Sequence, residues 1–204
     1  MNRMKLTATA LLIAASLAAC SSKTDASKEN FKTALQTYYS TTPGVCVSPP
    51  GRSVPFELET KPWFTPPSGI TLVARADALV DAGLLTRSEN LAKKMFVYNL
   101  TAEGQKHLTP GAGTNRARGD AFCTGKVVIK EVTSFTAPAD LMGFRISEAS
   151  YSFHAEGMAD WVKTPALAKA NQEIAKRLRG ELETNKAVLR LTSEGWVHDR
   201  TKAK

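Results

Sequence analysis

The 204-residue sequence carries a formal net charge of +8 and three cysteines. Its length allows one domain with a sizeable core or two small domains. The positive charge is spread along the chain, which favours a solvated basic surface over a dedicated site for a polyanion. The longest uncharged run near the start, residues 6–19, is too short to span a bilayer well, which excludes an ordinary transmembrane helix there.

The first twenty residues have the pattern of an export signal. Arg3 and Lys5 precede the apolar run 6–19, and small residues stand before Cys20. This pattern predicts a secretory signal peptide over residues 1–19. The last four residues, Leu17-Ala18-Ala19-Cys20, resemble the lipobox of bacterial lipoproteins. An ordinary signal peptide with a coincidental cysteine is the alternative.

The lipoprotein resemblance implies a place in the cell. It implies that Cys20 receives a diacylglyceryl group, that the chain is cut before it, and that the new amino group is acylated. Ser21, where an Asp would favour the inner membrane, implies anchoring at the periplasmic face of the outer membrane. Residues 20–27 would form the acylated cysteine and a polar tether. The basic surface would meet anionic lipid or lipopolysaccharide, and no nucleic acid.

The two remaining cysteines, Cys46 and Cys123, are expected to pair, because exported proteins fold in an oxidising compartment. Closing the intervening loop would stabilise the fold by roughly 4.5 kcal/mol in the chain-entropy model. A reactive or metal-binding thiol is the alternative, but no third ligand lies near either cysteine in the sequence.

The first half of the chain is predicted to contain three helices and one hairpin. Ser27 is placed to cap a helix whose apolar face carries Phe31, Leu35 and Tyr38. A proline-rich connector over 45–67 follows, and it serves either as a binding loop or as the cover of a core edge. Residues 70–82 then have helical spacing, with Gly83 placed to end the helix. A hairpin over 84–100 and a helix capped by Thr101 complete the region.

Residues 70–108 are similar to the second half of a winged-helix domain of the kind found in bacterial regulators. The resemblance implies a helix over 70–82 that enters the DNA major groove. Here that helix carries Arg75, Asp77 and Asp81, and this acidic balance opposes phosphate binding. With an export signal in front, we expect the shape to serve protein contact or a structural role. The predicted partner surface comprises the hairpin residues Arg87, Lys93 and Lys94 and the loop residues Trp63 and Phe64 of the segment 54–67.

The second half is rich in predicted strands. Strands are expected over 122–136, 144–155 and 187–191, with a bulge near Ser147 or Glu148 where the apolar parity changes. A helix is expected over 165–179. The predicted fold is therefore α+β. Helices and a winged-helix-like hairpin occupy residues 28–110, and an antiparallel sheet packed against the 165–179 helix occupies residues 120–200.

The sequence offers little for catalysis. His107, His154 and His198 lie on separate predicted elements, and no zinc, calcium, phosphate-loop or serine-elbow motif occurs. We expect no metal, no cofactor and no catalytic residues. A hydrolase built on Ser152, His154 and Asp160 is the least supported alternative.

The leading hypothesis is thus a non-catalytic, lipid-anchored periplasmic protein that binds another envelope component, most often a protein. The second hypothesis is a carrier or sensor of an apolar small molecule between the sheet and the 165–179 helix. Its candidate pocket would be lined by Tyr151, Phe153, Trp161 and Trp196.

Overall fold

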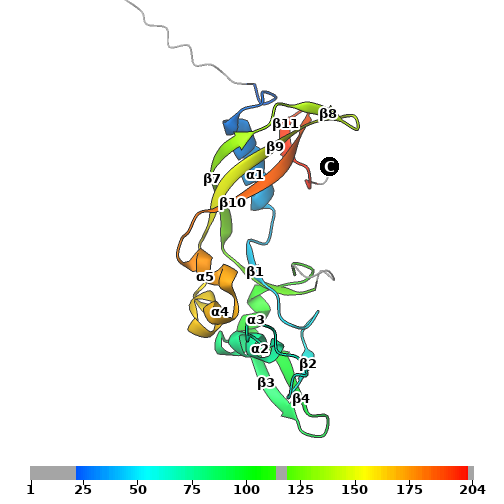
Figure 1. Cartoon of the computed structure of the whole chain (residues 1–204), viewed down its shortest axis with the longest axis vertical. Coiled ribbons are helices and arrows are strands. Elements are labelled where there is room, and N and C mark those ends of the chain that lie inside the picture. Colours follow the sequence, from blue (N-terminus) through cyan, green and yellow to red (C-terminus); the bar gives the residue numbers. More distant parts are fainter. Residues whose placement is uncertain (1–21, 114–118, 202–204) are drawn as a thin grey trace, which may run out of the picture.

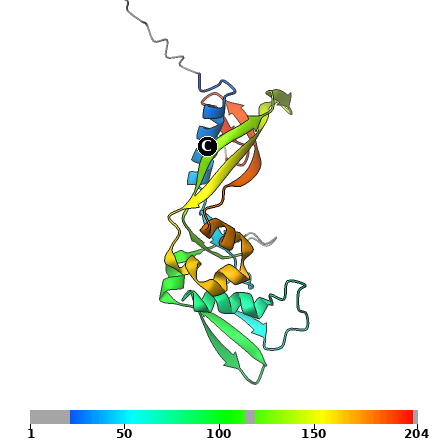
Figure 2. The ribbon, with the colours of Figure 1, turned by 60° about the vertical axis from the view of Figure 1, so that its left-hand side comes forward.

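The computed structural model describes residues 22–113 and 119–201, which form two lobes arranged end to end (Figures 1 and 2). Cys20 and the signal sequence lie outside the described residues. Each lobe has its own hydrophobic core. The fold is mixed α/β, with five α-helices in the described residues and antiparallel strand pairing, as the predicted α+β class requires.

The first lobe, called the sheet lobe, comprises residues 22–43, 126–156 and 183–201. Its curled sheet has the strand order β11-β10-β9-β7, and β8 pairs with the first residues of β9. One helix, α1, covers a face of this sheet. The bounds are α1 Lys28–Ser40, β7 Lys126–Phe135, β8 Ala139–Leu141, β9 Phe144–Glu156, β10 Glu183–Thr192 and β11 Gly195–His198.

The second lobe, called the helical lobe, comprises residues 45–113, 119–124 and 158–182. It contains two three-stranded sheets, of order β1-β6-β5 and β2-β4-β3, and the remaining helices. The bounds are β1 Val45–Val47, β2 Phe56–Glu59, α2 Leu72–Asp81, β3 Leu85–Asn90, β4 Met95–Leu100, α3 Ala102–His107, β5 Leu108–Thr109, β6 Ala121–Thr124, the 3-10 helix η1 Asp160–Lys163, α4 Pro165–Ala170 and α5 Gln172–Leu178.

Helix α1 begins where the sequence predicts, because the Ser27 hydroxyl accepts the Asn30 N–H at 3.2 Å. Its apolar face packs on the sheet, with Phe31 fully buried between Phe135 and Trp196. Both ring pairs have centroids 4.8 Å apart in edge-to-face geometry. The helix is therefore stabilised mainly by the packing of its aromatic side chain on the sheet, because an isolated helix of this length has little stability of its own.

The side chain of Gln36 fastens α1 to the edge of the sheet. Its amide nitrogen donates to the Val127 carbonyl at 3.1 Å, and its amide oxygen accepts the Ile129 N–H at 2.9 Å. Because β7 is an edge strand, these two backbone groups have no neighbouring strand to pair with on that side. The glutamine amide thus takes the place of a strand there.

Residues 22–27, predicted as part of a free tether, pack against the sheet lobe. The Asn30 side-chain amide donates to the carbonyls of Ser22 and Asp25 at 2.8 and 2.9 Å. The indole N–H of Trp196 donates to the Thr24 carbonyl at 3.0 Å. The chain is consequently held to the lobe from its first described residue.

The segment 165–179 departs from the prediction in two ways. It is two helices, α4 and α5, because Asn171 adopts an extended conformation (φ −141°, ψ 98°) and caps α5 through Ile174 N–H. It also packs on α2 of the helical lobe, while α1 covers the sheet. Each core therefore draws on both halves of the chain, and the division near residues 110–120 does not separate them.

The strand irregularities also differ from the prediction. Strand β9 pairs with β10 in unbroken register from Ile146 to Phe153, so the bulge expected at Ser147 or Glu148 is wrong. Register shifts occur instead in β7, between Ile129 and Glu131 and between Val132 and Ser134. The parity change arises because Phe144 and Ile146 lie on the outer face of the sheet, away from the buried Ala149 and Tyr151.

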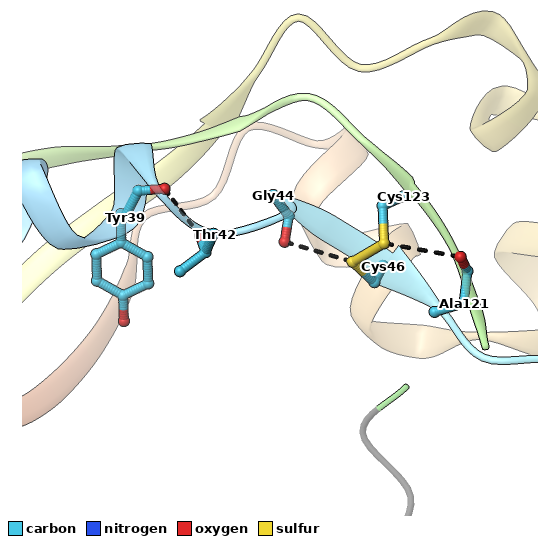
Figure 3. Close-up of a disulfide and its surroundings, with 6 residues drawn as sticks. All are labelled: Tyr39, Thr42, Gly44, Cys46, Ala121 and Cys123. Carbon is cyan, nitrogen blue, oxygen red and sulfur yellow. Dashed lines mark hydrogen bonds between the residues drawn. A yellow bond between two sulfur atoms is a disulfide. The ribbon is translucent and has the colours of Figure 1, made fainter. Parts of the chain in front are cut away.

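The predicted disulfide is present. Cys46 of β1 and Cys123 of β6 stand directly opposite each other in antiparallel register, and their sulfur atoms are bonded (Figure 3). Val45, Val47 and Phe122, the neighbours of these cysteines, are buried in the core of the helical lobe. The bond therefore fastens the strand that leaves α1 to the strand that leads into β7.

The chain crosses between the lobes four times, in the connections α1–β1, β6–β7, β9–η1 and α5–β10. Each crossing contains a glycine in the left-handed region: Gly44, Gly125, Gly157 and Gly180. The backbones of two crossings come into direct contact, because a Cβ on Gly44 would lie 2.3 Å from the Gly125 carbonyl oxygen. We call this narrow region the waist.

The elements α2, β3, β4 and α3 follow in the order that the winged-helix resemblance implies, and Thr71 and Thr101 cap the two helices. Gly83 ends α2 with a positive φ, as predicted. Strand β2, within the segment predicted as a connector, adds a third strand beside β4. The winged-helix resemblance itself stays a prediction.

Replacing Phe31 with Ala should destabilise the protein by about 3–5 kcal/mol, because the change leaves a cavity between Phe135 and Trp196. The measurement is urea unfolding followed by circular dichroism. Phe64→Ala, a truncation of the same size at a largely exposed position, is the control and should change stability little. Equal stability of the two variants would contradict the packing of α1 on the sheet.

Candidate functional site

The loop between β2 and α2 stands out from the side of the helical lobe (Figure 2). Prolines 62, 66 and 67 restrict its backbone and remove hydrogen-bond donors, so it forms neither helix nor strand. At its tip Trp63 is 90% exposed and Phe64 is 55% exposed, with ring centroids 5.8 Å apart. Two adjacent large aromatic side chains thus remain uncovered.

These aromatics line an apolar groove of about 400 Å³. Leu72 and Val73 of α2 form one wall, and the edge strand β2 with Met95 forms the other. The complete lining is Glu57, Leu58, Glu59, Pro62, Trp63, Phe64, Pro66, Leu72, Val73 and Met95. An uncovered surface of this kind, with charges only at its margin, is typical of a site that binds another molecule.

The margin of the groove is acidic. Glu57 and Glu59 belong to its lining, and the Lys93 ammonium lies 3.7 Å from Glu57. The turn that carries Lys93 is fastened to the groove side, because Thr60 N–H donates to the Lys94 carbonyl at 3.0 Å. Of the predicted partner surface, Trp63 and Phe64 therefore line the groove, Lys93 stands near its margin, and Lys94 supplies a backbone contact.

The structure places Arg87 elsewhere. Its guanidinium donates to the Asp77 carboxylate at 2.6 Å and lies 4.6 Å from the centroid of the Phe96 ring. The Tyr98 hydroxyl donates to the other oxygen of Asp77 at 2.9 Å. Burial, with the hydrogen bond to Asp77, raises the pKa of Tyr98. Arg87 thus joins strand β3 to helix α2, a role that its sequence neighbours do not reveal.

The four aromatic residues predicted to line a ligand pocket are not brought together. Tyr151, Phe153 and Trp196 belong to the core of the sheet lobe, and Trp161 belongs to the core of the helical lobe. The hydroxyl groups of Tyr151 and Tyr39 form a hydrogen bond, with their oxygen atoms 2.6 Å apart. Burial, with this hydrogen bond, raises the pKa of Tyr151. All four side chains are buried.

A second cavity, of about 440 Å³ and polar, lies where the end of α1 meets β10 and β11. The buried imidazole of His198 belongs to its lining and stacks on Tyr38 with ring centroids 3.8 Å apart. His198 Nδ1 accepts the Arg200 N–H at 3.1 Å and lies 2.8 Å from the Asp199 carboxylate. A single Nδ1 cannot accept and donate at once, and we assign the neutral acceptor form because burial lowers the pKa of His198.

The polar groups around this cavity bond to one another. Lys186 reaches Glu148 at 2.9 Å, and the two tyrosine hydroxyls described above form a pair. These mutual bonds explain the cluster as part of the sheet lobe's structure. The apolar groove, whose lining is mostly aliphatic and aromatic and includes the exposed Trp63 and Phe64, is the stronger candidate site.

Ser152, His154 and Asp160, the residues of the hydrolase alternative, do not form hydrogen bonds with one another. Ser152 is buried, and its hydroxyl has no hydrogen-bond partner. His154 bonds to Glu156 at 2.7 Å, and Asp160 accepts from Lys163 at 2.6 Å. No hydrogen bond joins any two of the three residues. Within the described residues, no group of three or more His, Cys, Asp or Glu side chains is arranged to hold a metal ion.

Comparison with known proteins finds no matching family model, no matching curated protein and no matching solved structure. Among the residues that the structure describes, no helix is long and apolar enough to cross a membrane. The functional conclusion therefore depends on the surfaces of this chain alone.

The stability of the protein should fall as the pH is lowered from about 7 to about 5, partly through His198. Burial, with repulsion from Arg200, lowers the pKa of His198 in the folded state, against a partial opposing effect of Asp199. The unfolded chain therefore takes up a proton near pH 6.5 that the folded chain takes up only at lower pH. The stabilisation is present above this range and is lost below it.

The measurement is the free energy of urea unfolding across this pH range. In His198→Phe, which keeps an aromatic ring against Tyr38 but cannot titrate, the dependence on pH should be shallower. An unchanged slope in the variant would show that His198 titrates alike in the folded and unfolded states.

Proposed function

We propose that this chain is a non-catalytic lipoprotein, anchored through Cys20 to the periplasmic face of the outer membrane, that binds another envelope protein. The binding site is the apolar groove of the helical lobe. The observation that carries the proposal is Trp63, a 90% exposed tryptophan on the wall of that groove. The lipobox resemblance of residues 17–20 supports the anchor.

The chemistry of the groove defines the partner's chemistry. Burying Trp63 and Phe64 would remove a large apolar area from water, and aromatic side chains dominate the affinity of protein interfaces. Glu57 and Glu59 at the margin favour basic side chains beside the partner's apolar residues. The expected partner segment is therefore apolar at its centre and basic at its flanks.

The position of the groove also fits an anchored adaptor. The described segment before α1, which is the part nearest Cys20 in sequence, lies at the far end of the sheet lobe, and the groove belongs to the other lobe (Figures 1 and 2). A membrane held at the Ser22 end would leave the groove clear of the bilayer. Such a surface is open to proteins of the periplasm and is not suited to lipopolysaccharide or anionic lipid, since its margin is acidic.

A photo-crosslinking amino acid at Trp63 or Lys93 should capture the same envelope protein in living cells. At Lys186, an exposed position on the sheet lobe, it should not. Trp63→Ala should weaken binding of the captured protein on the order of tenfold or more. Leu91→Ala is the matched control, because Leu91 is 77% exposed on the same lobe but does not line the groove.

The captured protein is identified by mass spectrometry, and its affinity for each variant is measured with purified components. Equal affinity of Trp63→Ala and Leu91→Ala would exclude the groove as the binding site. Crosslinks from Trp63 to lipid alone would exclude a protein partner.

The second candidate function, transport or sensing of an apolar small molecule, is favoured by one observation. The groove's volume of about 400 Å³ lies within the usual range of small-molecule sites. Native mass spectrometry separates the two functions. A co-purified apolar molecule that is lost in Trp63→Ala and kept in Leu91→Ala would favour the carrier, and an empty groove would favour the protein partner.

A further inference from the structure

A second uncovered apolar surface lies at the opposite end of the molecule, on the turn between β8 and β9. Leu141 is 53% exposed, Met142 is 91% exposed and Phe144 is 51% exposed. Leu141 and Phe144 face each other across the ladder, so the three side chains form one continuous tip. About half of the surface of Leu141 and Phe144, and nearly all of that of Met142, is left uncovered by the sheet lobe.

The geometry of the turn does not explain its composition. Met142 and Gly143 both have positive φ, 50° and 81°, as the two central residues of a tight hairpin turn do. Such turns favour Asn or Asp before the glycine, since these side chains tolerate the left-handed region. Met142 is a poor residue for this backbone and also exposes its whole side chain. Its apolar character therefore has to be explained by something outside the lobe.

The turn shares its end of the molecule with the start of the described chain. In Figures 1 and 2 the β8–β9 turn and the segment before α1 both lie at the tip of the sheet lobe. Ser22 is held there by the hydrogen bond from Asn30 to its carbonyl. Cys20 precedes Ser22 by two positions, and two residues span at most about 7 Å of extended chain. A lipid on Cys20 would bring this end of the lobe to the bilayer surface.

Two basic and two acidic side chains lie beside the tip. Arg145 follows Phe144 directly, and the Arg190 guanidinium lies 5.8 Å from the centroid of the Phe144 ring. Asp140, which stands opposite Arg145 in the ladder, and Asp199 balance these two positive charges. Long cationic side chains next to an apolar tip can place their charge among phosphates while the tip enters the acyl region.

We propose that the turn 141–144 inserts into the phospholipid bilayer to which Cys20 is anchored. This inference rests on the lipid anchor of the proposed function and is independent of the groove. The inserted tip is a second contact with the membrane, and together with the anchor it orients the long axis of the molecule away from the bilayer.

The test uses the full chain, processed and lipidated in a bacterial host and reconstituted into vesicles of phosphatidylethanolamine and phosphatidylglycerol. A polarity-sensitive fluorophore is attached at Met142→Cys in one sample and at Leu91→Cys in another. Both positions are exposed and apolar but lie on opposite lobes. With Cys46 and Cys123 in a disulfide, the new cysteine is the site of labelling.

We expect the fluorophore at 142 to shift to the blue and to be quenched by nitroxide groups on the lipid acyl chains. The fluorophore at 91 should show neither effect. Adding Phe144→Ser to the 142-labelled chain should reduce the quenching. Circular dichroism of each labelled chain checks that the fold is intact.

Three outcomes would overturn the proposal. A chain that floats with the vesicles while the fluorophore at 142 stays accessible to an aqueous quencher would leave the anchor standing and exclude insertion. Energy transfer between copies through position 142, without quenching by lipid, would show that the tip binds a second copy. A chain that does not float with vesicles, and whose intact mass shows no lipid, would overturn the anchor as well.

Discussion

The packing of α1 on a sheet built entirely from residues after 125 is the constraint on which the rest of the structure depends. Because the first helix and the last strands share one core, the intervening chain must leave the sheet lobe, form the helical lobe and return. The helical lobe is likewise completed by α4 and α5, which follow β9. Both cores therefore need contacts between residues far apart in sequence, a topology that slows folding. The same arrangement places the apolar groove and the apolar turn on different lobes.

The sequence predicts well those features that depend on neighbouring residues. The cap at Ser27, the glycine stop at Gly83 and the cap at Thr101 are correct because each is decided within one turn of helix. The Cys46–Cys123 pair is correct because the sequence has only two cysteines besides Cys20, and these allow one pairing. Trp63 and Phe64 are predicted as a contact surface and line a groove. The helical spacing of Leu72 and Val73 does not indicate that they line the same groove.

The sequence does not show which element each buried face packs against. An apolar stripe on residues 165–179 shows that one face is buried, but the stripe is the same whether it packs on a sheet or on α2. Tyr151 and Trp161 are both buried aromatics, and nothing in their spacing reveals that they belong to different cores. Arg87 is basic in a hairpin, yet its charge is balanced by Asp77, which precedes it by ten residues on another element.

The waist has a mechanical consequence. Where two chain crossings meet, at Gly44 and Gly125, the two backbones approach each other directly. Glycine rotates at little energetic cost because it lacks a Cβ. A bend between the lobes is nevertheless limited, because Arg177 of α5 and Glu183 of β10 form an ion pair of 2.8 Å between the lobes and Ala155 of β9 packs against the core of the helical lobe. The disulfide lies within the helical lobe and does not oppose such a bend. With the sheet lobe held at one end, these contacts between the lobes would keep the groove at one height and angle above the membrane, so a partner would have to bring its binding segment to that position.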